Sequence, residues 1–237
     1  MIDSTRSSHY ITRLLSKNSK LVHCLARSRD WFGGTRIITR GSRHSINVYQ
    51  SRLVRTYIQI DGENNTLKLE AASRLIDSVI VIKGKGHHVH IGRDCILNRM
   101  TLVLQSSECQ VEIGDRTTSS SVNIDLGEPR LSLHIGVDCM MSHRVEIMCG
   151  DAHSLDDAIT GERLNPPRDI QIGNHVWLGA ESAILKGASV GDNSIIGFRS
   201  VVTSQIPSCS LAVGIPARVT RSGVTWTRDL PWQNLVQ

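Results

Sequence analysis

The sequence predicts an all-β protein built as a parallel β-helix, and three observations support this fold class. Between residues 172 and 207 an apolar residue recurs at every sixth position: Ile172, Leu178, Ile184, Val190, Ile196 and Val202. Glycine directly follows four of these six residues. Aromatic residues make up only 4% of the chain, which suits a thin core of Ile, Val and Leu. A period of six fits neither an amphipathic helix nor an alternating strand, so it indicates a repeat architecture.

Each six-residue unit is expected to form one short strand and a corner, so that three units complete a triangular turn of eighteen residues. Side chains eighteen residues apart then stack about 4.8 Å apart along the axis, which places Ile172 on Val190. A second column of mostly small residues fills the inward corners: Val176, Ser182, Ala188, Ser194, Ser200 and Ile206. Because each turn buries its face only against its neighbours, we expect several stacked turns.

A looser repeat precedes this block, with an offset of twenty-two residues. It is visible in the segments that begin at Leu67, Val89, Val111 and Leu133, and in the apolar column Ile82, Leu104, Leu126 and Met148. Four longer turns with extended sides or bulged corners are therefore predicted. The expected organisation is a basic N-terminal segment over 1–60, a β-helix over 61–221 and a tail over 222–237.

The net positive charge of the chain comes from its N-terminal segment. Residues 1–55 have a balance of +9, and the remainder of the chain has −4. Apolar residues from Ile11 to Leu25 fall near helical spacing with basic residues between them, which predicts an amphipathic helix. We expect it to pack across the end of the coil; the alternative is contact with an anionic membrane surface. Nucleic-acid binding is not expected, because aromatic residues do not alternate with the basic ones.

The composition of the chain indicates the cellular compartment in which the protein is expected. The chain has no apolar run long enough to cross a bilayer, and residues 1–30 lack the apolar middle of a signal peptide, so a cytoplasmic protein is expected. The cysteines show neither paired metal spacing nor a dense disulfide framework, and reduced thiols are expected. They are Cys24, Cys95, Cys109, Cys139, Cys149 and Cys209.

The sixfold rhythm fails between residues 150 and 169. This stretch contains Asn165 followed by two prolines, and it reads as a loop that protrudes from one corner. Loops held on rigid scaffolds are where catalytic residues concentrate. The loop contains His153 close to Asp151.

Two motifs carry a resemblance to a known family. The run Val176-Trp177-Leu178-Gly179 and the closing Val213-Gly-Ile-Pro-Ala-Arg218 resemble the hexapeptide-repeat acyltransferases, over roughly residues 67–221. The resemblance implies a left-handed coil, acetyl-CoA as co-substrate, and a homotrimer with active sites between subunits. It is closest to the bacterial enzymes that acetylate polysaccharide or sialic acid hydroxyls. An O-acetyltransferase acting on a capsule, lipopolysaccharide or sialic-acid glycan is therefore expected.

The resemblance also implies roles for the loop residues. His153 matches a histidine that such enzymes carry in a similar loop, and imidazole is the base best suited to removing a hydroxyl proton near neutral pH. Asp151, Asp156 or Asp157 could orient the imidazole, and the sequence does not choose among them. Asp151, Asp156 and Asn165 are the expected substrate contacts.

The co-substrate site is implied by the regular coils. Trp177 is expected at the catalytic centre and in the pantetheine groove, and the other expected cofactor-binding residues are Gly179, Ala180, Phe198, Arg199, Thr203, Arg218 and Arg221. Phe198-Arg199 departs from the small residue and glycine usual in the family, and Ser204 replaces a common lysine. Guanidinium groups suit phosphate, which favours Arg218.

Three alternatives stay open at this point. The acceptor could be an amine on a nucleotide-linked amino sugar or an antibiotic. The coil could belong to a zinc-dependent carbonic-anhydrase-like protein, although no metal is expected because no His-x4-His pair lies near the relevant coils. A binding scaffold without activity would explain the repeats but not the irregular loop that carries His153.

Overall fold

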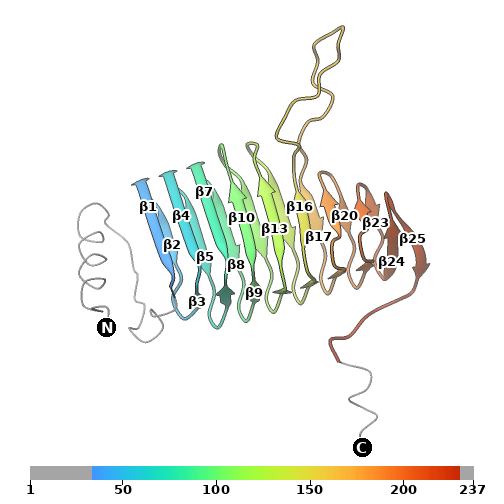
Figure 1. Cartoon of the computed structure of the whole chain (residues 1–237), viewed down its shortest axis with the longest axis horizontal. Coiled ribbons are helices and arrows are strands. Elements are labelled where there is room, and N and C mark those ends of the chain that lie inside the picture. Colours follow the sequence, from blue (N-terminus) through green and yellow to red (C-terminus); the bar gives the residue numbers. More distant parts are fainter. Residues whose placement is uncertain (1–33, 230–237) are drawn as a thin grey trace, which may run out of the picture.

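The computed structural model describes residues 34–229, and it shows a prism whose three sides are β-sheets (Figure 1). Each side contains eight parallel strands, one from each turn, so the chain winds through eight turns. No helix occurs within residues 34–229, and accordingly none there could span a membrane. The amphipathic helix expected between Ile11 and Leu25 lies outside the described residues.

We name the sides sheets A, B and C in the order in which the chain visits them. Sheet A consists of β1 (Arg36–Ser42), β4 (Tyr57–Glu63), β7 (Val79–Lys85), β10 (Met100–Leu104), β13 (Val122–Leu126), β16 (Val145–Met148), β19 (Ala183–Leu185) and β22 (Val201–Val202). Sheet B consists of β2 (Ser45–Asn47), β5 (Thr66–Leu69), β8 (His88–Ile91), β11 (Gln110–Ile113), β14 (Ser132–Ile135), β17 (Ile170–Ile172), β20 (Ser189–Val190) and β23 (Gln205–Ile206). Sheet C consists of β3 (Arg52–Val54), β6 (Arg74–Ile76), β9 (Ile96–Asn98), β12 (Thr118–Ser119), β15 (Met140–Met141), β18 (Trp177–Leu178), β21 (Ile195–Ile196) and β24 (Ser210–Gly214), with β25 (Ala217–Ser222) antiparallel at its edge.

The strand register confirms both predicted repeats. Ile172 pairs with Val190 at the eighteen-residue offset, and Leu67 pairs with Val89 at the twenty-two-residue offset. The inward-pointing residues of all three sheets form one continuous buried core. The small column that begins at Val176 and ends at Ile206 is also buried. One stack of apolar side chains therefore holds the eight turns together.

The long turns place their additional residues at one corner. In the register of the sheets, eleven residues separate Ile80 in sheet A from Ile91 in sheet B, whereas six separate the equivalent Ile184 and Val190. The corner from sheet A to sheet B, here called the A–B corner, is thus wider in the first five turns. The other two corners are called B–C and C–A.

The coil starts earlier than the sequence analysis placed it. Strands β1, β2 and β3 form a full turn before residue 61, where the β-helix was expected to begin. Their inward residues Ile37, Ile46 and Leu53 are only partly buried, because this turn has a described neighbour on one side only. None of these inward residues is followed by a glycine, which made this turn difficult to recognise in the sequence.

Buried polar side chains link the corners of successive turns. Ser73 Oγ donates to the Gly92 carbonyl and accepts the N–H of Cys95, and Thr117 Oγ1 repeats the arrangement with Gly136 and Cys139. These hydroxyls satisfy backbone groups that would otherwise be buried without partners.

The wide A–B corner uses an amide and an imidazole in the same way. Asn65 Nδ2 donates to the Gly84 carbonyl, and its Oδ1 accepts the N–H of His87. One turn further, His87 Nδ1 accepts the N–H of Cys109, so Nε2 carries the proton that is donated to the Lys83 carbonyl. His87 is fully buried in its neutral form, and burial lowers its pKa below the ordinary value of 6.5.

This arrangement predicts a pH dependence of stability. The unfolded chain accepts a proton at His87 near pH 6.5, whereas the folded chain resists it, so the free energy of unfolding falls as the pH drops below 6.5. Urea unfolding at pH 7 and pH 5 should show a larger loss for the wild type than for His87→Asn, which copies Asn65 of the preceding turn. Equal losses in the two proteins would contradict the proposed role of His87.

Candidate active site

One long excursion interrupts the coil. Residues 150–169 leave the A–B corner after β16, project away from the prism and return at β17 (Figure 1). Backbone hydrogen bonds between Leu155 and Leu164 and between Asp157 and Glu162 fold the excursion into a narrow hairpin. Leu155, Ile159 and Leu164 have exposed fractions of 60%, 96% and 58%. A projecting hairpin with bare apolar side chains is the kind of surface that another protein chain covers.

An ion pair fixes the base of this loop to the preceding turn. The Arg163 guanidinium donates from Nη1 and Nη2 to the two carboxylate oxygens of Glu128, at 2.5 and 2.8 Å. The hydrogen bonds from Arg163 hold the pKa of Glu128 below its usual range. The loop therefore leaves the coil in a defined direction although its tip is exposed.

A second polar cluster surrounds the backbone of His153. Asn165 Nδ2 donates to Asp151 Oδ2 at 2.7 Å and to the His153 carbonyl at 2.9 Å, while its Oδ1 accepts the N–H of Leu155. Lys186 Nζ binds the same Asp151 carboxylate and donates to the Asn165 carbonyl. Lys186, followed by Asn165, lowers the pKa of Asp151. The cluster holds the main chain at residue 153 and leaves the imidazole exposed.

None of the three candidate carboxylates orients the His153 ring within residues 34–229 of one chain. Asp151 is occupied by Lys186 and Asn165, and Asp156 accepts a hydrogen bond from Ser154. Asp157 accepts the N–H groups of Ile159 and Thr160 and so forms the turn at the tip of the hairpin. Asp151 and Asn165, which the sequence assigned to substrate contact, also serve to shape the loop.

The predicted pantetheine residues line sheet C and the C–A corner. Trp177 is half-buried in β18, and its Nε1–H donates to Ser142 Oγ at 3.0 Å. Gly179 begins the corner, where a Cβ would lie 2.5 Å from the Ile196 carbonyl oxygen, so only glycine fits. Ala180 follows it, and the Arg199 N–H donates to the Ala180 carbonyl, which confirms the predicted stacking of the two corners.

The departure at Phe198 and Arg199 has a structural consequence. The Phe198 ring is 62% exposed, and the Arg199 guanidinium lies 4.9 Å from the ring centroid. Arg199 Nε also pairs with Glu181 at 2.6 Å, and Arg144 binds the same carboxylate. Phe198 therefore offers an apolar surface, and the Arg199 guanidinium shares the Glu181 carboxylate with Arg144.

The remaining predicted cofactor residues lie elsewhere. Thr203 is exposed just after β22, on the A–B side of the prism. Arg218 and Arg221 are exposed on β25, and neither forms an ion pair with any residue in the range 34–229. These two guanidinium groups are accessible to a phosphate.

The described tail forms a contact that the sequence analysis missed. The chain after β25 returns across the B–C corner, where Trp226 stacks on His175 with ring centroids 4.2 Å apart. Trp226 Nε1–H donates to the His175 carbonyl at 2.7 Å, and His175 bonds Asp138 through Nδ1. Arg228 pairs with the other oxygen of Asp138 at 3.1 Å. The signal in the sequence was a tryptophan just after the last repeat, which indicates a contact but not its partner.

This tail also touches the candidate site. The Trp226 ring lies 6.2 Å from the Trp177 ring, centroid to centroid, at an angle of 50°. Trp226 is 8% exposed, so the tail forms part of the folded surface that supports Trp177. The last residues of the described chain thus help to shape the wall that the pantetheine residues occupy.

Sheet A separates the two groups of candidate residues. His153 and Thr203 lie at the A–B corner, whereas Gly179, Ala180 and Phe198 lie at the C–A corner on the other edge of the same sheet. No hydrogen bond or ring contact between His153 and Trp177 occurs within residues 34–229. Two coils packed side by side could bring the A–B corner of one against the C–A corner of the other.

A metal site would need several ligand side chains close together. In the described range of a single chain, no three His, Cys, Asp or Glu side chains come close enough together to bind one. The zinc alternative requires histidines from two chains, and the metal content of the purified protein tests it directly.

The fold and the site define a class of protein. A triangular coil of hexapeptide repeats, broken once by a loop that carries an exposed histidine, is the architecture of the hexapeptide-repeat acyltransferases. The family described as "Bacterial transferase hexapeptide (six repeats)" matches residues 169–204, which are the two most regular turns.

Known proteins place the chain more closely. The polysialic acid O-acetyltransferase of Neisseria meningitidis is 34% identical over 150 residues, which cover 62% of this chain and 68% of that protein. The chain therefore belongs to the family of hexapeptide-repeat acetyltransferases. Among solved structures, the polySia-specific acetyltransferase NeuO is similar with a TM-score of 0.74 and 27% identity, over 83% of this chain and 90% of that one. The polysialic acid O-acetyltransferase OatWY follows with a TM-score of 0.64 and 26% identity, over 82% and 93%.

Removing the Trp226 ring should destabilise the coil. Trp226→Ala loses a buried ring and its hydrogen bond, and we expect the free energy of unfolding to fall by about 3 kcal/mol. Trp226→Phe keeps an aromatic ring on His175 and loses only the N–H donor, so a decrease of about 1 kcal/mol is expected. Urea denaturation of the three proteins measures both changes, and wild-type stability in Trp226→Ala would refute this role of the tail.

The four buried cysteines of the coil are weak nucleophiles. Burial raises the pKa of Cys95 and Cys139 to about 11 and that of Cys149 to about 12, and it also raises the pKa of Cys109. All four thiols are buried and none forms a disulfide. A thiol of this kind is mostly protonated at neutral pH and is a poor nucleophile.

We therefore expect these four cysteines to resist alkylation. Folded protein treated with iodoacetamide at pH 8 should remain unmodified at all four, whereas protein in urea should react at each. Peptide mapping by mass spectrometry distinguishes the sites, and half-buried Cys209 serves as the internal comparison. Rapid labelling of Cys149 in the folded state would show that the core opens near the loop.

Proposed function

We propose that the protein is an O-acetyltransferase that moves the acetyl group of acetyl-CoA to a sugar hydroxyl of a bacterial surface polysaccharide. The observation that carries the proposal is the exposed imidazole of His153, whose main chain is held by the Asp151–Asn165–Lys186 cluster where the coil is interrupted. Similarity to two solved polysialic acid acetyltransferases supports a glycan acceptor. The position of the hydroxyl on the sugar is left to experiment.

The proposal includes an assembly, a homotrimer with active sites between subunits. Its support is the separation of His153, at the A–B corner, from Trp177 on sheet C, the opposite side of the prism. The bare apolar side chains of the hairpin, Leu155, Ile159 and Leu164, supply a surface for a neighbouring subunit to cover. One subunit then contributes the base and the next contributes the pantetheine wall.

In the proposed mechanism His153 removes the hydroxyl proton while the sugar oxygen attacks the thioester carbonyl. The C–O bond forms, the C–S bond of the tetrahedral intermediate then breaks, and the imidazolium returns its proton to the departing thiolate. Backbone N–H groups of an adjacent coil are suited to stabilise the oxyanion. The transfer is direct, because the buried, protonated cysteines of the coil are poor acyl carriers.

The residues present fit the co-substrate. Ala180 is half-buried at the C–A corner beside the buried Gly179, and the exposed ring of Phe198 can cover an apolar part of the molecule. Arg218 and Arg221 are accessible cations for phosphate. Trp177 would line the thioester end of the groove.

Two substitutions test the proposal. We expect His153→Ala to lower kcat by about 10²- to 10⁴-fold, the usual contribution of a general base. Thiol release from acetyl-CoA in the presence of polysialic acid measures it, and mass spectrometry of the glycan confirms transfer. The control is His90→Ala, which removes a half-buried histidine from β8 on sheet B, three turns before the loop.

Trp177→Ala should mainly weaken the binding of the co-substrate and so raise the KM for acetyl-CoA. A folded His153→Ala protein with wild-type turnover would show that another group is the base. Absence of transfer to any glycan by the wild type would refute the proposed reaction itself.

A further inference from the structure

Residues 223–229 form a strap along the B–C corner of the prism. In the eighth turn, the Val224 N–H donates to the Cys209 carbonyl at 3.0 Å. In the sixth turn, the Trp226 ring stacks on His175. Arg228 then reaches the fifth and fourth turns. At about 4.8 Å per turn, the strap spans about 19 Å of the coil.

Arg228 anchors the far end of the strap. Its Nη1–H donates to Thr118 Oγ1 at 2.9 Å, and its Nη2–H donates to the Cys139 carbonyl at 3.0 Å. Its Nε–H binds one oxygen of the Asp138 carboxylate at 3.1 Å, and His175 binds the other. Burial would raise the pKa of Asp138, but the hydrogen bonds from His175 and Arg228 outweigh it and lower that pKa. Charge as well as packing therefore holds the strap.

His175 connects this anchor to Trp226. Its Nδ1 lies 2.7 Å from Asp138, and its Nε2 lies 2.9 Å from the Trp226 carbonyl oxygen, so the imidazole is fixed at both nitrogens. The planes of the His175 and Trp226 rings differ by only 7°, and the indole N–H donates to the His175 carbonyl. Trp226 thus has one defined position on the coil.

The strap reaches Trp177, which is fixed from two directions. Its Nε1–H donates to Ser142 Oγ of the preceding turn, and its ring lies 6.2 Å from the Trp226 ring at an angle of 50°. Tilted aromatic rings at this distance attract each other. Because the next residue, Leu178, points into the core, the Trp177 side chain stands on the outer face of sheet C, where it is half-buried. The strap therefore supplies part of the packing that decides its orientation.

We infer that Trp226 is a positioning residue, which holds the Trp177 ring in the orientation that the pantetheine arm of acetyl-CoA requires. Trp226 is 8% exposed and offers the co-substrate little surface of its own, so it acts through Trp177. Arg228 acts one step further away, by holding the strap. The inference rests on the proposed function, and it adds that the affinity for acetyl-CoA depends on a segment outside the repeats.

Calorimetric titration with acetyl-CoA tests the inference without an acceptor sugar. Trp226→Ala should raise the Kd about fivefold, the contribution of one aromatic contact, and Trp226→Phe should restore most of the affinity. In steady-state kinetics the KM for acetyl-CoA should rise by the same factor, with kcat nearly unchanged. Wild-type affinity in folded Trp226→Ala protein would overturn the inference.

A double-mutant cycle separates positioning from a general loss of structure. If Trp226 acts through Trp177, then adding Trp226→Ala to the Trp177→Ala protein should leave its Kd unchanged. Independent, additive effects of the two substitutions would show that Trp226 acts in another way.

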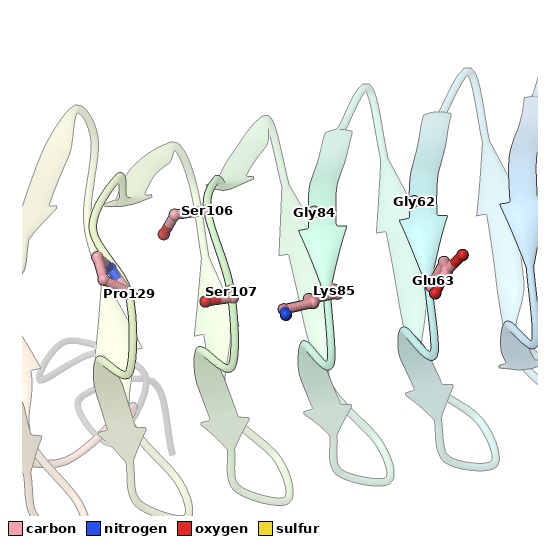
Figure 2. Close-up of a pocket in the computed structure, with 7 residues that line it drawn as sticks. All are labelled: Gly62, Glu63, Gly84, Lys85, Ser106, Ser107 and Pro129. Atoms are coloured by element: carbon pink, nitrogen blue, oxygen red, sulfur yellow. The ribbon is translucent and has the colours of Figure 1, made fainter.

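Two exposed side chains provide controls. Tyr49→Ala removes an aromatic ring from the B–C corner of the first turn, and Lys85→Ala removes a side chain from the A–B corner, where Figure 2 shows it. Both variants should bind acetyl-CoA as the wild type does. Should Trp226→Ala fail to fold, Arg228→Ala keeps both tryptophans and should raise the Kd in the same direction; wild-type affinity in that variant would overturn the inference.

The measurements also distinguish the inference from the proposed function. Wild-type protein that binds acetyl-CoA but acetylates no glycan would refute the proposed reaction, and the affinities of the variants would still decide the role of Trp226. Wild-type protein that does not bind acetyl-CoA would overturn both.

Discussion

The structure depends on one constraint: each inward apolar side chain must stack on its equivalent in the turn before it. The spacing between turns is fixed by the parallel backbone ladder, so neither a missing nor an additional residue is tolerated on the inward face. Additional residues can only move outward at a corner. The wide A–B corner of the early turns and the hairpin over residues 150–169 both place additional residues outward at the same corner, and the hairpin is the longer of the two.

Polar side chains make it possible for a corner to hold additional residues. A widened corner turns some backbone groups inward, and Asn65 and His87 satisfy them there with hydrogen bonds that bridge two turns. At the hairpin, the ion pair between Glu128 and Arg163 ties the loop to the preceding turn on the outside. Hydrogen bonds at the A–B corner therefore accompany the irregularities of the coil, while the apolar column runs through every turn.

The two halves of the candidate site follow different physical rules. The pantetheine wall around Trp177 and Gly179 is built into the regular coil and is supported by Trp226 from the tail. The proposed base, His153, belongs to a loop whose main chain is fixed by hydrogen bonds, and its imidazole is exposed. A rigid wall suits a co-substrate of constant shape, and an exposed base suits an acceptor that belongs to a large polymer. Packing of neighbouring chains is what our proposal adds to unite them.

The sequence by itself determined the period of the coil, the pairing of Ile172 with Val190, and the place where the rhythm fails at His153, because each follows from which side chains must face inward. It did not reveal the first turn, whose partly buried residues Ile37 and Leu53 lack the repeat signature. Only the tertiary structure decided where Trp226 docks, which groups bind the loop carboxylates, and that His153 and Trp177 lie on opposite sides of the prism. These are contacts between residues far apart in the chain, and local periodicity carries no information about them.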